Sequence, residues 1–152
     1  MSEGAASRGF AAAFSDMPLV LKGITSFFVV YGLGSLILAL APGVGQRVAG
    51  VELSQAEFFA AGHGAFALVM GAWLTGSALG LLRRARWGCW GTILAYALFV
   101  PAEPFFAEPP RVAFQAILAL VWAVGAWAYL FRSRGAVDFF AQAPRVSPAG
   151  AS

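Results

Sequence analysis

Four long stretches with no charged residue in their middle constrain this chain more than any other feature of its sequence. A helix needs about 20 mostly apolar residues to cross the roughly 30 Å hydrocarbon core of a bilayer, because each residue adds about 1.5 Å. The stretches cover about residues 19–41, 55–82, 87–106 and 112–131. They predict an all-α fold, an integral membrane four-helix bundle that runs up-down-up-down.

The composition supports lipid as part of the solvent. Of the 152 residues, 60% are hydrophobic and 11% are charged, whereas soluble domains average about 45–50% apolar and about 25% charged residues. The formal charge of +3 does not predict a nucleic-acid surface, because the basic residues lie in short clusters beside apolar stretches rather than on one polar face. We therefore expect the lipid bilayer, and no nucleic acid, as a partner.

Boundary signals mark the first two stretches. Pro18 suits the first turn of a helix, where the missing N–H would be unpaired in any case. Ser54 and Glu57 have the spacing of a capping box, which satisfies free backbone N–H groups at a helix start. The second stretch ends at a very short arginine-rich turn, which predicts a tight antiparallel hairpin with the third: Arg83, Arg84 and Arg86.

Proline interrupts the third stretch, whereas the fourth is regular. Trp87–Val100 supplies fourteen residues before Pro101, which is about 21 Å of helix. We expect a kinked or partly unwound segment to complete this crossing near residue 106. The fourth stretch ends at Arg132, and Gly135 has the position of a C-cap.

The distribution of Lys and Arg predicts the orientation. With both termini and the arginine turn in the cytoplasm, eight basic residues lie inside and two lie outside, which satisfies the positive-inside rule. The inside set is Arg8, Lys22, Arg83, Arg84, Arg86, Arg132, Arg134 and Arg145, and the outside set is Arg47 and Arg111. We expect cytoplasmic tails at 1–17 and 136–152 around a domain at 18–135, in a bacterial inner membrane.

Small residues predict where the helices approach each other. In lipid there is little hydrophobic force between helices, so their association depends on van der Waals packing between closely spaced backbones, which small residues allow. One stripe of the second stretch ends in the pair Gly76 and Gly80, and the fourth stretch carries Ala119 and Ala123 in a similar stripe. A second stripe consists of Ala60, Gly64, Ala67, Gly71 and Thr75. Two stripes suit a helix with two neighbours, or one of them binds another copy or a larger complex.

Three polar side chains are expected at similar depth near the outer surface. His63, Glu103 and Gln115 could together bind a small polar or lipophilic ligand, since ionisable groups within a membrane usually serve a function. Alternatively, each forms its own hydrogen bonds at the interface or across helices. We expect no metal site, no cofactor and no catalytic residues, because the sequence contains no HExxH, phosphate-binding loop or recognisable nucleophile–histidine pair.

Two segments give an architectural resemblance. The basic turn GLLRRARW at Gly80–Trp87 and the ending YLFRSRGAVDFF at Tyr129–Phe140 resemble segments of small bacterial inner-membrane proteins. The resemblance implies a four-helix architecture and no catalytic residue. The sequence favours a non-enzymatic accessory or assembly subunit that acts through helix–helix contacts, and the alternative is a binding or carrier protein for a small ligand.

Overall fold

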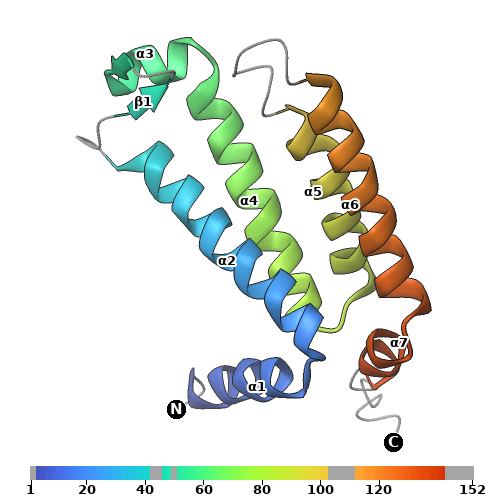
Figure 1. The fold of residues 1–152 in the computed structure, drawn as a ribbon. Helices are drawn as coiled ribbons and strands as arrows, with labels where there is room; N and C mark the ends of the chain where they lie inside the picture. Colours follow the sequence, from blue (N-terminus) through green and yellow to red (C-terminus); the bar gives the residue numbers. More distant parts are fainter. Residues whose placement is uncertain (1–2, 42–45, 49–50, 103–111, 143–152) are drawn as a thin grey trace, which may run out of the picture.

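The computed structural model describes residues 3–41, 46–48, 51–102 and 112–142, which form seven helices and two short strands. The expectation of a mainly helical chain is confirmed. Four helices run alongside one another, namely α2, α4, α5 and α6 (Figure 1). Helices α1 (Glu3–Asp16) and α7 (Arg134–Ala141) lie at one end of them, and the strands and α3 (Gln55–Ala60) lie at the other.

Two helices are long and apolar enough to cross a membrane: α2 (Leu19–Leu40) and α4 (His63–Leu82). Helix α6 (Val112–Arg132) meets the same test when its Ala116–Arg132 part is combined with α7, to which it is joined by a 59° bend. The ends of α2 and α6 each lie within one residue of those expected from the sequence. Proline and the arginine clusters therefore mark these ends well.

The second expected stretch is not one continuous helix. The capping box at its start is confirmed, since the Ser54 Oγ accepts from the Glu57 N–H and a Glu57 carboxylate oxygen accepts from the Ser54 N–H at 2.8 Å. Helix α3 then ends, and Gly62 has a φ of 82°, in the left-handed region that glycine adopts without steric cost. The chain changes direction there, so that the long helix α4 begins at His63.

Helix α5 (Arg86–Ala102) begins directly after the arginine turn and includes Pro101. Its seventeen residues are fewer than the roughly 20 expected for a full crossing. The remainder of the third expected stretch, up to residue 106, lies outside the described residues. In the turn, Arg84 has a φ of 56°, the only positive φ at a described residue other than glycine.

A short hairpin, which the sequence did not predict, precedes α3. Strand β1 (Gln46–Val48) pairs antiparallel with β2 (Val51–Leu53). The Gln55 side chain beside it donates to the Ala39 carbonyl at 3.1 Å, near the end of α2. This bond joins the start of α3 to α2, and the buried side chains Ala39, Phe58 and Ala67 form a small core beside it.

The four long helices pack in chain order: α2 against α4, α4 against α5, and α5 against α6. Among the described residues, α2 and α6 do not form a packed pair of this kind. Within the described part of the chain, α7 and the segment before α2 complete a core near the arginine-rich end of the row. That core consists of Met17, Leu21, Leu81, Cys89, Leu130 and Phe139.

Candidate functional site

The predicted polar cluster can be placed only in part. His63 is the first residue of α4 and is half-buried, with its ring stacked on that of Phe58 at 5.7 Å between centroids. Glu103 lies outside the described residues. Gln115 belongs to the first turn of α6, but its side chain is not described. A ligand site made by these three side chains therefore stays a prediction.

The local fold explains the position of His63. The capping box starts α3, and the left-handed Gly62 then turns the chain into α4. Phe58 is buried against Ala39 and Ala67, so the ring beside His63 is held by the core at this end. The imidazole ring of His63 covers one face of the Phe58 ring, and His63 stays half-buried at the start of α4.

The two predicted packing glycines of α4 have different surroundings. A Cβ atom built at Gly80 would meet the Gly88 Cα at 2.7 Å and the Trp87 ring at similar distance, which no real side chain tolerates. A Cβ atom at Gly76 would meet nothing within 4 Å. Gly80 thus allows α4 and α5 to approach closely, whereas Gly76 lines an open cleft between them.

The second small stripe of α4 faces α2. A Cβ atom at Gly71 would lie 2.8 Å from the Gly32 carbonyl oxygen, and one at Gly32 would lie 2.6 Å from the Thr75 hydroxyl oxygen. Close backbone approach of this kind is how small residues hold helices together in lipid. On α6, Ala119 and Ala123 are buried, at 2% and 8% exposure.

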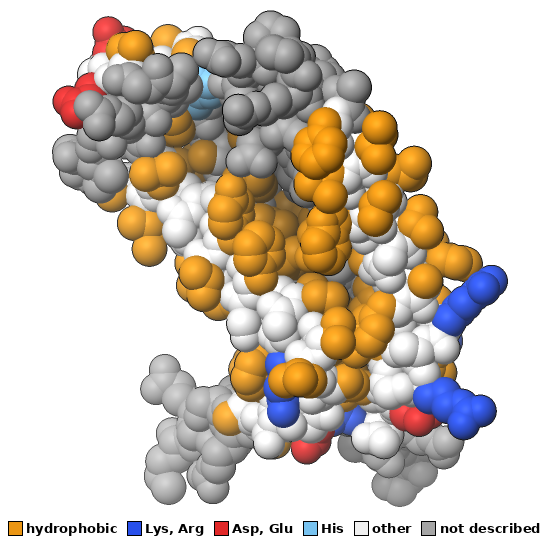
Figure 2. Space-filling view, in the orientation of Figure 1, with side chains coloured by type: hydrophobic (Ala, Val, Ile, Leu, Met, Phe, Trp, Pro, Cys, Tyr) orange, Lys and Arg blue, Asp and Glu red, His pale blue; other side chains and the backbone are white. Residues whose placement is uncertain are grey.

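A cleft lies between α2 and α6, which we call the α2–α6 cleft. It has a volume of about 390 Å³ and is lined by Phe27, Tyr96, Leu118 and Trp122. The rings of Tyr96 and Trp122 are stacked, with centroids 5.9 Å apart. Phe27 and Trp122 are 53% and 54% exposed, so the two helices leave large aromatic surfaces uncovered. Figure 2 shows hydrophobic side chains across this hollowed face.

A second cleft of about 390 Å³ lies between α4 and α5, and Gly76 is part of its lining together with three tryptophans. One of them, Trp73, donates its ring N–H to the Gly91 carbonyl at 3.0 Å and so joins the two helices. The complete lining is Ala72, Trp73, Gly76, Ser77, Trp87, Trp90, Gly91 and Leu94. Gly76, a member of the first small stripe of α4, is thus bordered by aromatic side chains.

Arg84, in the arginine turn, joins the first and last helices of the described chain, α1 and α7. Arg84 donates to the Asp16 carboxylate at 3.1 Å, at the end of α1, and to the Gln142 carbonyl at 3.1 Å, just after α7. Its guanidinium carbon also lies 4.5 Å from the centroid of the Phe139 ring. Sequence analysis identified Arg84 as a topology signal and missed this role, because its partners are 58 and 68 residues away.

No protein-family model matches this chain, and no curated protein or solved structure shows significant similarity to it. The chain is mainly helical, and two of its helices are long and apolar enough to span a membrane.

Proposed function

We propose that this chain is an integral membrane protein with four spans, α2, α4, α5 and α6, and with both termini in the cytoplasm. We further propose that it acts without catalysis, as an accessory or assembly subunit that binds a partner through helix–helix contacts. The exposed apolar side chains on α2 and α6 support the membrane assignment, since soluble monomers rarely expose contiguous apolar surfaces larger than a few hundred Å². Examples are Val30, Ile37, Phe114, Leu120 and Val121, all more than 60% exposed.

The placement of the charges supports the orientation. Arg83, Arg84 and Arg86 lie in or beside the α4–α5 turn, and Arg132 and Arg134 lie beside the α6–α7 bend. Both places are at the end where α1 and α7 lie, and Figure 2 shows the blue side chains gathered there. With this end in the cytoplasm, the basic side chains reach the inner headgroup layer, as the positive-inside rule requires.

The α2–α6 cleft is the main support for the proposed accessory role. In a closed bundle the first and last helices would cover each other, whereas here Phe27 and Trp122 are each more than half exposed. We propose an apolar transmembrane helix of a partner subunit as the occupant, because the cleft lies between two helices that run alongside each other in opposite chain directions, and its lining is mainly apolar and aromatic. Such a helix would complete the row on its open side.

Purification in a mild detergent, with affinity capture of this chain, tests the proposal. Leu118→Trp should fill the cleft and release a stoichiometric protein partner. Leu120→Trp is the matched control, because Leu120 lies on the same helix and is exposed, but does not line the cleft. The accessory role is abandoned if no protein partner is captured, or if both variants retain it equally.

A second candidate function has the same cleft as its basis. A pocket of about 390 Å³ with aromatic walls is within the roughly 300–1,000 Å³ range of small-molecule sites. A binding or carrier role for a small lipophilic ligand would therefore appear in the same purification as a stoichiometric small molecule that Leu118→Trp displaces. Mass spectrometry of the captured material distinguishes the two functions directly.

A further inference from the structure

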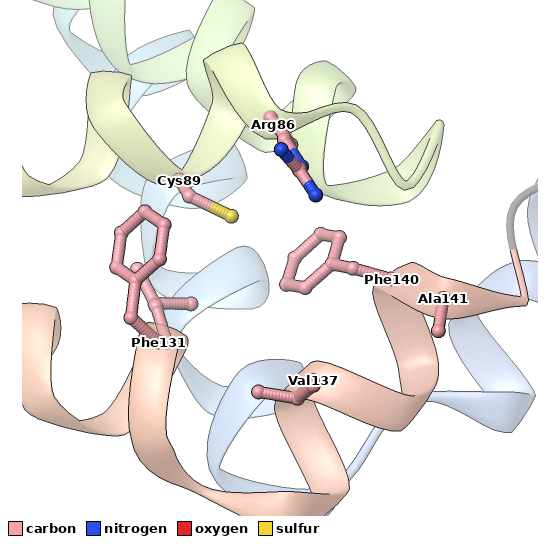
Figure 3. A pocket seen from close by; sticks show the side chains of 7 residues that line it. Arg86, Cys89, Phe131, Val137, Phe140 and Ala141 are labelled. Atoms are coloured by element: carbon pink, nitrogen blue, oxygen red, sulfur yellow. The ribbon is translucent and has the colours of Figure 1, made fainter.

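A pocket of about 360 Å³ opens at the arginine-rich end, between the start of α5, the end of α6 and α7. Figure 3 shows the side chains of Arg86, Cys89 and Phe140 converging on the space between α5 and α7. The bend of 59° after α6 places α7 across this opening as a wall. The lining consists of Arg86, Cys89, Leu130, Phe131, Val137, Phe140 and Ala141.

Arg86 is the cation of this pocket, and it differs from its neighbours in the turn. Arg83 lies over the Phe10 ring at 5.9 Å, and Arg84 pairs with Asp16. Among the described residues, neither a carboxylate nor another hydrogen-bond acceptor pairs with the exposed Arg86 side chain. A guanidinium group has five N–H donors in a planar fork that matches phosphate geometry. The pocket therefore offers a set of donors that no carboxylate of the described residues neutralises.

The remainder of the pocket is apolar. Leu130 and Cys89 form a buried floor, at 2% and 3% exposure, whereas Phe131 and Val137 keep 37% and 44% of their surface exposed. A free phosphate would satisfy Arg86 and leave these side chains in contact with water. A ligand that carries an acyl chain next to its phosphate would cover both the cation and the apolar walls.

We propose that this pocket binds an anionic phospholipid. Arg86 donates to the phosphate oxygens, and Phe131, Val137 and Phe140 contact the first part of one acyl chain. The inference rests on the proposed membrane placement, because that placement puts the arginine-rich end at the depth of the lipid headgroups. Arginine can donate charge-assisted hydrogen bonds to the phosphate of either kind of lipid. The selectivity for an anionic over a zwitterionic lipid therefore comes from net charge, because the quaternary ammonium group of phosphatidylcholine is repelled by the Arg86 guanidinium group.

Native mass spectrometry of the full chain, released from maltoside micelles, tests this site. Phosphatidylglycerol and phosphatidylcholine with identical acyl chains are added separately, and the bound fraction is measured against lipid concentration. We expect phosphatidylglycerol to bind with one tight site per chain. Arg86→Gln should weaken it about tenfold or more, since it removes hydrogen bonds between charged groups. Arg134→Gln is the matched control, because Arg134 is exposed at the same end but does not line the pocket.

Two further variants separate the site from surface charge and from misfolding. Arg86→Lys should retain part of the affinity, and Val137→Trp should lower it by filling the apolar part while Arg86 stays in place. The proposal is overturned if phosphatidylcholine binds equally well, if Arg86→Gln and Arg134→Gln weaken binding to the same extent, or if millimolar inorganic phosphate displaces the lipid.

The assay contains no protein partner, so its result is independent of partner capture. Loss of lipid selectivity with a captured partner would reject only the pocket, and lipid selectivity without a partner would reject only the accessory role. Size-exclusion chromatography before lipid is added shows whether the chain stays monodisperse without detergent. If it does, the membrane placement itself fails.

Discussion

The guanidinium group of Arg84 lies over the ring of Phe139, with 4.5 Å between its central carbon and the ring centroid, and the same group donates to Asp16. One side chain thus joins the α4–α5 turn to the end of α1 and to α7. Arg84 also has a left-handed backbone, with a φ of 56°, a conformation that costs energy for any residue with a Cβ atom. The contacts of the side chain offset this cost.

Replacement of Arg84 should therefore loosen both terminal helices. Arg84→Gln removes the ion pair with Asp16 and the contact with Phe139, and we expect a loss of about 1–2 kcal/mol, because Asp16 is largely exposed and exposed ion pairs contribute little. Thermal unfolding in detergent measures it. Arg83→Gln, whose contact is one ring at 5.9 Å, should have a smaller effect. Equal effects of the two variants would contradict this role.

Alanine at Gly80 should separate α4 from α5. Its Cβ atom would lie 2.7 Å from the Gly88 Cα, so backbone has to move, and overpacking of this kind costs about 1–3 kcal/mol. Gly76→Ala is the control one turn away, where a Cβ atom meets nothing within 4 Å and where alanine favours the helix. We expect a lower midpoint of thermal unfolding for Gly80→Ala and an unchanged or higher one for Gly76→Ala. The reverse order would rule out this contact.

Gly71 gives the corresponding test of the α2–α4 contact. A Cβ atom there would lie 2.8 Å from the Gly32 carbonyl oxygen and from the Leu36 side chain. Gly71→Ala should therefore destabilise the protein, again by about 1–3 kcal/mol. Gly34→Ala, in open space on α2, provides the comparison. If unfolding monitored by circular dichroism does not distinguish these two variants, the helices do not approach as described.

The capping box should make the start of α3 sensitive to acid. Hydrogen bonds from the Ser54 side chain and backbone lower the pKa of the Glu57 carboxyl group below its ordinary value of 4.5. Because the folded-state pKa is the lower one, the stabilisation is present above the ordinary value of 4.5, which applies to the unfolded chain, and is lost as pH falls through the folded value. Amide exchange at the start of α3 should accelerate in that range. Ser54→Ala should weaken this pH dependence, because it removes the hydroxyl and keeps the backbone N–H, and Glu57→Gln should abolish it. Glu52→Gln should preserve it.

The orientation predicts the result of a reporter experiment. A reporter inserted at residue 44 should be read on the outer side of the membrane, and one fused after residue 152 should be read in the cytoplasm, because eight basic residues flank the inner ends and two flank the outer ends. A paired fusion at both positions in one strain controls for expression. A cytoplasmic signal from the insertion at residue 44 would contradict the proposed topology.

The sequence predicted those features of the fold that depend on neighbouring residues. The capping box of Ser54 and Glu57 needs only a spacing of three, and the arginine turn marked the end of α4 correctly. The break at Gly62 was missed, since glycine is common within apolar helices and its φ depends on how the core holds Phe58. The hairpin of β1 and β2 was missed too, because three-residue strands have too few residues to show alternation.

The candidate sites were less predictable, since they depend on which helices meet. Periodicity placed Gly76 and Gly80 on one stripe, but only the position of α5 separates an open glycine from one against Gly88. The pocket at Arg86 exists only because α7 bends back after Ser133. The direction of this bend could not be predicted from the sequence. The polar set of His63, Glu103 and Gln115 lies partly outside the described residues and stays a prediction.

The order in which the helices pack has a consequence for synthesis on the ribosome. Because α4 packs on α2, α5 on α4 and α6 on α5, each new helix finds its neighbour already made, and contacts that are close in sequence form quickly. Arg84 is different, since Phe139 and Gln142 emerge more than fifty residues after it. Helix α7 therefore completes a contact whose other half, the turn at Arg84, has already left the ribosome when α7 is made.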